Sequence, residues 1–203
     1  MIAFSRVFLA AVLLFLATAA WSGDYKTGRN AYDIGDYATA LTVWQPLAEA
    51  GDANGQFGLG LLYGNGFGVE MIDEQALLWY GKAAGQGHAA AQCNLAVMHL
   101  NGWGVPMNEE EAAKYYLMAA EQGITEAQIA LGLILAADYS PLYNKEEAYK
   151  WLSVADRLGD LNAGPKREDL AARLSADEVI EADGMVSMWF ESHGGLVASD
   201  DED

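Results

Sequence analysis

Few of the residues that could perform catalysis stand in a catalytic arrangement. Lys26-Thr27-Gly28 matches one of the boxes of penicillin-recognising enzymes. A serine acyl-enzyme of that kind also needs a Ser-x-x-Lys pair to supply its nucleophile and base, and no serine of this chain is followed by lysine three residues later. We therefore interpret the tripeptide as the exposed start of a first helix, and we expect no catalytic residue in the chain.

Metal ligands and reactive thiols are equally sparse. The histidines are His88, His99 and His193, and they form neither an HExxH motif nor a cluster with cysteine, so no metal site is expected. His99 stands 36 residues after Tyr63, and we expect a packed side chain with one hydrogen bond. Cys93 is the single cysteine, which excludes an internal disulfide, and without a basic neighbour it is expected to behave as a small apolar residue. No cofactor is expected.

Acidic residues outnumber basic ones, with 29 Asp and Glu against 11 Lys and Arg, which gives a formal net charge of −18. A chain this acidic repels phosphate, so nucleic acid and anionic lipid headgroups are excluded as partners. We interpret Glu109-Glu110-Glu111 as the first turn of a helix, where acids suit the helix dipole. The run Asp200-Asp201-Glu202-Asp203 is interpreted as a solvated tail. Weak attraction of divalent cations is the alternative for both runs.

The first twenty residues have the pattern of a secretory signal. Arg6 is the only charged residue before Asp24, and an apolar run of 14 residues follows it at 7–20. This length suits the core of a signal peptide and is short for a bilayer span, which needs about 20 residues. We expect cleavage after Ala19, with Ala20 as the next choice, and an uncleaved membrane anchor is the alternative. Either interpretation places the rest of the chain outside the cytoplasm, in the periplasm or secreted.

A sequence period of 36 residues is the strongest pattern in the chain. Five kinds of residue recur at this interval without a gap. The recurring columns are Gly51, Gly87, Gly123 and Gly159; Ala40, Ala76, Ala112 and Ala148; Gln56, Gln92 and Gln128; Leu59, Leu95 and Leu131; and Trp79, Tyr115 and Trp151. A repeat of this length cannot bury its apolar face alone, so neighbouring repeats must stack on one another.

Each period predicts two helices joined by a turn that is rich in glycine. The helical spacing of the apolar residues favours this interpretation, as does the glycine that follows each second helix. The fourth turn departs from the pattern because Asp138, Ser140 and Pro141 replace Gly-x-Gly-Val, so its geometry is expected to differ. The first helices are expected at 54–64, 89–100 and 125–137, and the second helices from about Asp73, Glu109 and Lys145.

In its third copy, the repeat has the motif Gln92-Cys93-Asn94-Leu95-Ala96, Gly102-Trp103-Gly104-Val105 and Ala112-Ala113-Lys114-Tyr115-Tyr116. This motif resembles that of the Sel1-like repeat family, a relative of the tetratricopeptide repeats. The resemblance implies an all-α fold, namely a right-handed α-solenoid of about four 36-residue helix-turn-helix repeats with C-terminal capping helices. It also implies protein–protein interaction as the function.

The resemblance argues against one enzymatic branch of the family. The cysteine-rich branch that has been associated with β-lactam binding and hydrolysis carries paired cysteines that join the two helices of each repeat. This chain has Ala84, Ala120 and Asp156 at the position of one of those cysteines. We therefore do not expect the activity of that branch.

These patterns divide the chain into four parts. They are a signal peptide (1–19), a repeat array (20–162), C-terminal capping helices (163–192) and an acidic disordered tail (193–203). Ser175 and Glu178 form a Ser-x-x-Glu capping box that would start the last helix. The repeats are expected at about 24–51, 52–87, 88–123 and 124–159, and the residues expected to cover the open end of the stack are Met185, Val186, Met188 and Trp189.

The exposed part of the first helices is the candidate binding surface. In the superhelix that the resemblance implies, these helices line the concave side. Apolar residues with interleaved asparagines could dock a peptide or helix there, with the asparagine amides bonded to backbone groups and the turn aromatics as anchors. The alternative is that these residues pack against an adjoining helix. The candidates are Leu61, Asn65, Phe67, Asn94, Val97, Asn101, Trp103 and Leu133.

Together the patterns predict a non-enzymatic periplasmic module for protein–protein interaction. It would be a scaffold or regulator of an envelope process, a monomer that binds a protein partner and has no membrane contact beyond the signal segment. One alternative is a structural accessory that stabilises a larger envelope assembly. Another, by family analogy alone, is a hydrolase of β-lactams or peptidoglycan.

Overall fold

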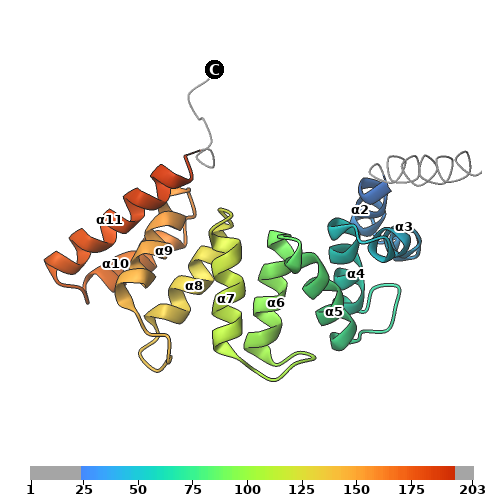
Figure 1. The fold of residues 1–203 in the computed structure, drawn as a ribbon, viewed down its shortest axis with the longest axis horizontal. Coiled ribbons are helices and arrows are strands. Elements are labelled where there is room, and N and C mark those ends of the chain that lie inside the picture. The colour runs from blue at the N-terminus through green and yellow to red at the C-terminus, as the bar shows by residue number, and fades with distance from the viewer. Residues whose placement is uncertain (1–23, 195–203) are drawn as a thin grey trace, which may run out of the picture. The chain divides into compact units, whose positions relative to one another are not determined.

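The computed structural model describes residues 24–194. Within this range the chain forms ten α-helices and no strand, which confirms the all-α fold class (Figure 1). The expected signal peptide and residues 195–203 of the expected acidic tail lie outside the described residues. The helices are α2 (Asp24–Asp33), α3 (Tyr37–Glu49), α4 (Ala53–Asn65), α5 (Asp73–Gly85), α6 (Ala89–Asn101), α7 (Glu109–Ala120), α8 (Thr125–Ala136), α9 (Lys145–Arg157), α10 (Ala163–Ala171) and α11 (Ala176–Ser192).

Two compact units make up the described chain, and each is described by itself. Unit 1 comprises the residues up to Ala91 together with Trp103–Val105, and unit 2 comprises Gln92–Gly102 and the residues from Pro106 onwards. Unit 1 therefore holds α2 to α5, and unit 2 holds α7 to α11. Helix α6 begins in unit 1 and continues in unit 2.

The second helices α5, α7 and α9 begin at the residues that the sequence predicts. Asn108 caps α7 because its side-chain oxygen accepts the backbone N–H of Glu111 at 3.0 Å, and Asn144 caps α9 through Glu147 at the same distance. The side-chain oxygen of each cap satisfies a backbone donor that has no partner within the helix. The acidic first turns therefore lie at helix N-termini, where the helix dipole favours negative charge.

Trp44 is the centre of the unit 1 core. It is fully buried, and its Nε1 donates to the backbone carbonyl of Tyr25 at 3.2 Å. A Cβ atom on Gly28 would lie 2.4 Å from the indole Nε1, and one on Gly58 would lie 2.3 Å from Cδ2. Both positions need glycine because the indole ring occupies the space of a side chain. Gly28, which we expected to be exposed, is therefore a buried packing residue.

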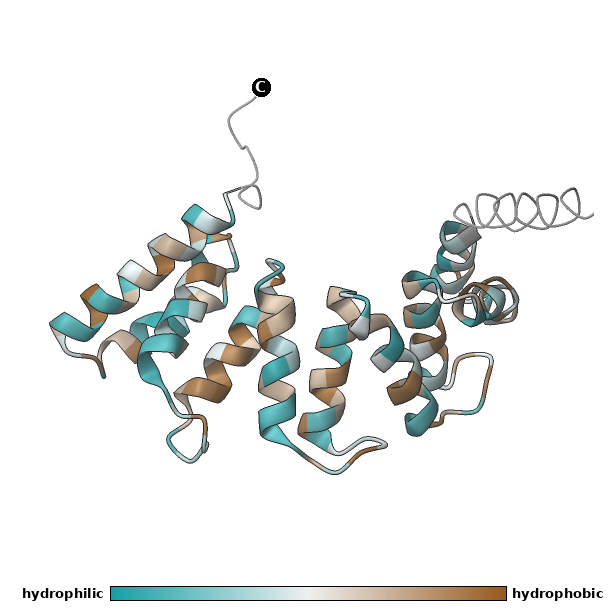
Figure 2. Cartoon of the chain, in the orientation of Figure 1, coloured by the Kyte–Doolittle hydropathy of each residue, from teal (hydrophilic) through white to brown (hydrophobic). Residues whose placement is uncertain are grey.

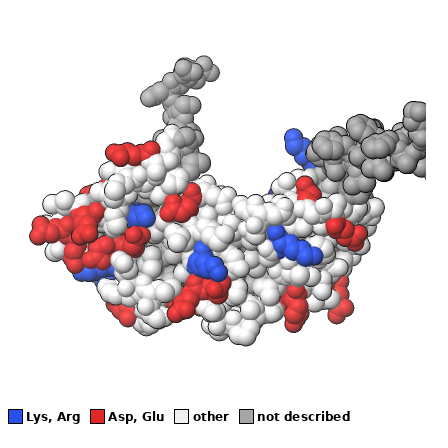
Figure 3. Space-filling model, in the orientation of Figure 1, with Lys and Arg blue, Asp and Glu red and all other residues white. Residues whose placement is uncertain are grey.

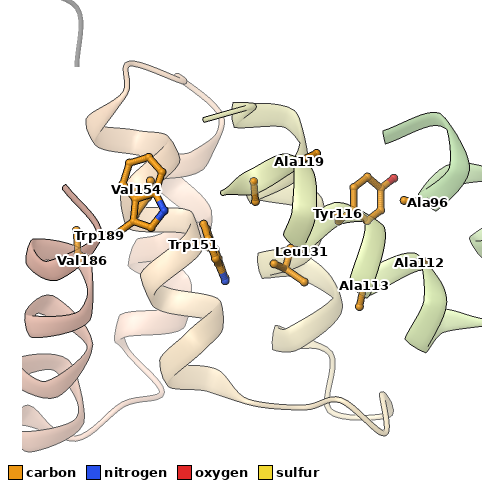
Figure 4. Close-up of a cluster of buried hydrophobic side chains, with 12 residues drawn as sticks. Ala96, Ala112, Ala113, Tyr116, Ala119, Leu131, Trp151, Val154, Val186 and Trp189 are labelled. Carbon is orange, nitrogen blue, oxygen red and sulfur yellow. The ribbon is translucent and has the colours of Figure 1, made fainter. Parts of the chain in front are cut away.

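The core of unit 2 forms between α6, α7, α8, α9 and α11 (Figure 4). Helix α8 is largely apolar (Figure 2), as expected for a helix that packs against α7 and α9. Trp151 of α9 is buried and makes an edge contact with Trp189 of α11, with ring centroids 6.4 Å apart. Figure 4 shows Trp189 beside Val154 and Val186. This aromatic contact joins the last helix to the repeats.

The repeated aromatic column is buried in only one of its three positions. Trp151 lies in the core, whereas Trp79 and Tyr115 are half-buried. The Nζ of Lys82 lies 3.9 Å from a ring centroid of Trp79, and the Nζ of Lys114 lies 5.6 Å from that of Tyr115. Trp79 and Tyr115 therefore pack at the edges of the cores of their units, and a lysine side chain lies over each ring.

The turn inside each repeat packs on the preceding repeat. Gly68 has a φ of 71°, and a Cβ atom there would lie 2.9 Å from the Cβ of Tyr37, the first residue of α3. Gly104 has a φ of 66°, and its Cβ would lie 2.7 Å from the carbonyl carbon of Asp73, the first residue of α5. The two glycines and the two residues they contact are each 36 positions apart, so one contact is repeated.

The fourth turn makes the same contact with different chemistry. Ser140 takes the place of the glycine, is buried, and donates its hydroxyl to the carboxylate of Glu109, the first residue of α7. Its Oγ also accepts the backbone N–H of Leu142 at 3.1 Å. A hydrogen bond thus replaces the close backbone approach. Since no residue other than glycine has a positive φ between residues 24 and 194, the geometry of this turn differs from that of the glycine turns, as the sequence predicts.

A pair of glutamines links the helices at the same place in two repeats. The Nε2 of Gln86 donates to the Oε1 of Gln56 at 2.8 Å in unit 1. In unit 2 the Nε2 of Gln122 donates to the Oε1 of Gln92 at the same distance. Gln56 and Gln92 are almost fully buried, so these bonds satisfy acceptors that water cannot reach.

The third position of this glutamine series lacks its donor. Gln128 is fully buried and donates its Nε2 to the carbonyl of Ala120 at 3.0 Å. Leu158 stands 36 residues after Gln122, where a donor would be needed. The Oε1 of Gln128 accordingly has no hydrogen-bond partner within residues 24–194. An unpaired buried acceptor of this kind costs roughly 1–3 kcal/mol.

Helix α11 closes the C-terminal side of unit 2. Its expected capping box forms: Ser175 Oγ accepts the N–H of Glu178 at 3.3 Å, and Glu178 Oε2 accepts the N–H of Ser175 at 2.7 Å. Val186 and Trp189 are buried against the repeats, whereas Met188 stays exposed. Met185 is half-buried and packs against the core beside α9 and α10, so three of the four residues expected to cover the stack do so, and Met188 does not.

We expect Glu178 to titrate at an unusually low pH. Its carboxylate pairs with Lys145 of α9 at 2.8 Å, and this bond, with the N–H of Ser175, lowers its pKa from 4.5 to about 2. Because the folded pKa lies below the unfolded value, the stabilisation is present above about pH 4.5 and is lost as the pH falls towards 2. Carbon NMR of the Glu178 carboxyl measures this, and Lys145→Met should raise the pKa towards its ordinary value.

Lys166→Met removes a distant lysine of α10 and serves as the control. It should leave the titration of Glu178 unchanged. If Glu178 titrates near 4.5 in the unaltered protein, the ion pair between Lys145 and Glu178 does not hold in solution.

Candidate protein-binding surface

The candidate residues of unit 1 lie on α4 and in the turns. Asn65 is the last residue of α4, is exposed, and donates its Nδ2 to the carbonyl of Leu61 at 2.8 Å. Phe67 stacks on Tyr37 with ring centroids 4.4 Å apart and an angle of 12° between the rings, so it is part of the core and not an exposed anchor. Trp103, by contrast, is 50% exposed.

The candidate residues of unit 2 lie on α6 and α8. Asn101 is exposed and repeats the bond of Asn65, since its Nδ2 donates to the carbonyl of Val97 at 2.8 Å. Val97 is half-buried and packs against the core of the unit, and Asn94 is also half-buried. Leu133 of α8 is exposed. The eight candidates are thus divided between the units, and the exposed apolar ones are Trp103 and Leu133.

The two exposed asparagines have a structural use that the sequence interpretation missed. Each one bonds a carbonyl in the last turn of its own helix, where backbone acceptors lack partners. One amide donor of each side chain is therefore already engaged. Two other residues of the first helices pack inside the protein and do not face a partner. Gly58 of α4 is buried against Trp44, and Ala130 of α8 packs against the unit 2 core.

The thiol and one imidazole near these helices are unreactive packing groups. Cys93 packs against the unit 2 core, and burial, reinforced by the charge of Glu126, raises the pKa of its thiol to about 11. It is therefore protonated at neutral pH and a poor nucleophile or ligand. His88 stacks on Phe57 at 4.5 Å and accepts the N–H of Ala91, and burial lowers its pKa.

The other two histidines also pack against aromatic rings. His99 stacks on Tyr115, as a packed residue should, but its buried Nδ1 has no hydrogen-bond partner in the described part of the chain. His193 stacks on Trp189 at 4.3 Å and faces Glu121, which also accepts Trp189 Nε1 at 2.9 Å. The contacts of Glu121 with Trp189 and His193 hold the C-terminal end of α11 against the end of α7, beside a hollow of about 330 Å³.

The described residues offer neither a metal site nor a membrane span. Between residues 24 and 194, no three His, Cys, Asp or Glu side chains gather in a way that could hold a metal ion. No helix of that range has the length and apolar character that crossing a bilayer requires.

Sequence reasoning missed the exposed residues at the start of the second helices. Tyr139 stands 36 residues after Trp103, in the same turn position, and is 90% exposed. Met71 and Met107 are also 36 residues apart, and they are 63% and 73% exposed. The 36-residue register contained this signal, because Tyr139 continues the series of Phe67 and Trp103, and Met107 repeats Met71.

The Sel1 repeat family matches three consecutive segments of 36 residues, at 53–88, 89–124 and 125–160. The chain belongs to the Sel1 repeat family. The matched segments make up just over half of the 203 residues and coincide with the helix pairs α4–α5, α6–α7 and α8–α9. Sel1 repeat proteins generally mediate protein–protein interaction and are mostly non-enzymatic scaffolds, and their repeats place this chain among the all-α solenoids.

Solved structures of other Sel1 repeat proteins resemble this chain. The crystal structure of a Sel1 repeat protein from Oxalobacter formigenes is 35% identical over 69% of this chain and 56% of its own, with a TM-score of 0.64. The crystal structure of c5321, a protective antigen present in uropathogenic Escherichia coli strains, is 27% identical over 79% of this chain and 43% of its own, with a TM-score of 0.54. The chain spans about half the length of these two proteins. No curated protein matches it.

Proposed function

We propose that this Sel1 repeat protein is an exported, non-enzymatic module that binds a protein partner in the bacterial periplasm. The observation that carries the proposal is the 36-residue array itself, which repeats a packed helix pair and exposes apolar residues without a catalytic arrangement in the described chain. A surface made from repeated helices suits an extended peptide or a partner helix.

The first helices are the part of the array that we propose as the binding side. Leu133 offers an exposed apolar side chain on α8, and the exposed Asn101 keeps its amide oxygen and a second donor for a partner backbone. The envelope location rests on the secretory pattern of residues 1–19, and the bacterial origin of the two similar structures supports it. A protein that binds a partner without catalysing a reaction would act as a scaffold or a regulator.

Capture of the partner from an envelope extract tests this proposal. Leu133→Arg places a charge on the proposed surface and should abolish the capture of a specific envelope protein, without changing the helical circular dichroism. Leu161→Arg is the matched control, because Leu161 is exposed outside the first helices and should leave capture intact. Equal capture by both variants would reject this surface. The exported protein should begin at Ala20, which N-terminal sequencing determines.

A structural accessory of an envelope assembly is the second candidate function. It predicts a complex of fixed stoichiometry on native gels, whereas a regulator would be present in smaller amounts than its target. Hydrolysis is kept as a control: the purified protein should not turn over a chromogenic β-lactam.

A further inference from the structure

Every Sel1 repeat of this chain carries an aromatic residue at the same place in its turn. The three residues are Phe67, Trp103 and Tyr139, each 36 positions after the one before. Their surroundings differ in the first residue of the second helix in the preceding repeat, on which each turn packs. That residue is Tyr37 for Phe67, whose ring it covers by stacking at 4.4 Å. The ring of Phe67 is thereby shielded from a partner protein.

In unit 1 the covering tyrosine is replaced by an acid. Asp73 begins α5, and Gly104 packs directly on the peptide between Asp73 and Glu74. Trp103, the residue before Gly104, therefore belongs to a turn that lies against the backbone of the acidic first turn of α5, and it remains 50% exposed. Met71, two residues before Asp73, is 63% exposed. We call these four residues turn patch 1: Met71, Asp73, Glu74 and Trp103.

Unit 2 contains the same arrangement one period later. Glu109 begins α7 and accepts the hydroxyl of Ser140, which places Tyr139 beside the acidic first turn of that helix. Tyr139 is 90% exposed, Met107 is 73% exposed, and Glu110 is exposed as well. We call these four residues turn patch 2: Met107, Glu109, Glu110 and Tyr139.

The charge of both patches is negative, and the basic residues of the two helices do not neutralise it. Helix α5 has a single basic residue, Lys82, whose Nζ lies over the ring of Trp79. Helix α7 has only Lys114, which pairs with Glu111 at 3.1 Å. Figure 3 shows acidic side chains where α5 and α7 begin. Each patch thus combines an exposed aromatic ring, an exposed methionine and two carboxylates.

We propose that turn patches 1 and 2 are docking sites for a basic, amphipathic segment of a partner protein. This inference names the partner chemistry for the protein-binding function proposed above and rests on it. An aromatic face next to carboxylates binds the ammonium of lysine or the guanidinium of arginine through cation–π attraction and charge-assisted hydrogen bonds. A methionine beside them adapts to apolar side chains of varied shape. The segment that fits both features alternates cationic and apolar residues.

A pair of synthetic peptides tests this chemistry on the purified protein. One is amphipathic, with lysines on one helical face and leucines on the other, and the second has every lysine replaced by glutamate. Calorimetry at physiological ionic strength should detect binding of the lysine peptide and none of the glutamate peptide. The double variant Trp103→Ala with Tyr139→Ala should weaken binding about tenfold, since an exposed aromatic in contact with a cation is typical of binding hot spots.

A control variant separates the patches from the overall negative charge. Leu161→Ala with Asp169→Asn removes an exposed apolar residue and an exposed acid that lie outside both patches, and it should leave the affinity unchanged. Glu74→Gln with Glu110→Gln should weaken binding several-fold at unchanged helical content. Equal losses in the control and in either patch variant would show attraction to net charge alone and would overturn the proposal. Unaltered binding by the Trp103–Tyr139 variant would overturn it too.

The outcome is distinguishable from that of the function experiment. Leu133→Arg lies outside the patches and should not alter binding of the lysine peptide. If Leu133→Arg abolishes capture of the envelope protein while the lysine peptide does not bind, this inference is wrong and the proposed function stands. If the peptide binds at the patches and no envelope protein is captured, the proposed first-helix surface is wrong.

Discussion

Replacing Trp44 with alanine should lower the free energy of unfolding of unit 1 by about 3–5 kcal/mol. The indole is fully buried, and two glycines are in contact with its ring. Glycines have no side chain that could move into the space, so the cavity left by the ring cannot be refilled from Gly28 or Gly58. Chemical denaturation followed by circular dichroism measures the loss, and amide exchange should locate it in α2, α3 and α4.

Trp103→Ala is the matched control for this prediction. It removes the same side chain from a half-exposed position and should cost less than about 1 kcal/mol. A similar loss of stability in the two variants would mean that Trp44 is not the centre of a tightly packed core.

Replacing Gly104 with alanine should destabilise unit 1 by roughly 3 kcal/mol, the sum of two costs. Its φ of 66° is unfavourable for any residue with a Cβ, which costs about 1–2 kcal/mol. The added Cβ would also lie 2.7 Å from the backbone of Asp73, which is a helical residue and cannot move aside as a flexible side chain would. The variant should therefore loosen the turn from α5. Thermal denaturation and the exchange rates of the α5 amides measure the effect.

Gly81→Ala should change the stability in the opposite direction. Gly81 lies inside α5, and a Cβ atom there would meet nothing within 4 Å. Alanine is the better helix former by about 0.5–1 kcal/mol, so this variant should be more stable than the natural protein. If the two alanine variants had equal effects, the contact between Gly104 and Asp73 would be unimportant in solution.

Much of the fold could be predicted because its determinants recur in the sequence. The 36-residue register located α5, α7 and α9 to the residue, and the Ser175–Glu178 pattern located the start of α11. These features depend on local rules, such as capping and dipole preferences, which act within a few residues of the chain. The departure of the fourth turn was also visible, since Ser140 breaks a glycine pattern.

Which of the equivalent side chains are exposed could not be predicted in the same way. Phe67 and Tyr139 occupy equivalent positions, yet one is stacked in a core and the other is almost fully exposed. The difference arises from Tyr37 and Glu109, which lie 30 residues earlier in the chain and contact these turns only in the folded protein. Side-chain bonds to the same helix, such as those of Asn65 and Asn101, are likewise absent from a pattern of residue types.

The unpaired Oε1 of Gln128 has a consequence for lengthening the protein by design. A duplicate of segment 89–124 brings its own copy of Gln122 and therefore a donor for the buried glutamine of the helix pair. A duplicate of 125–160 brings Leu158 instead, and each inserted copy would add another acceptor without a donor. Longer versions of this protein should accordingly be assembled from the third repeat, with the fourth kept once, as the terminal unit on which α11 closes.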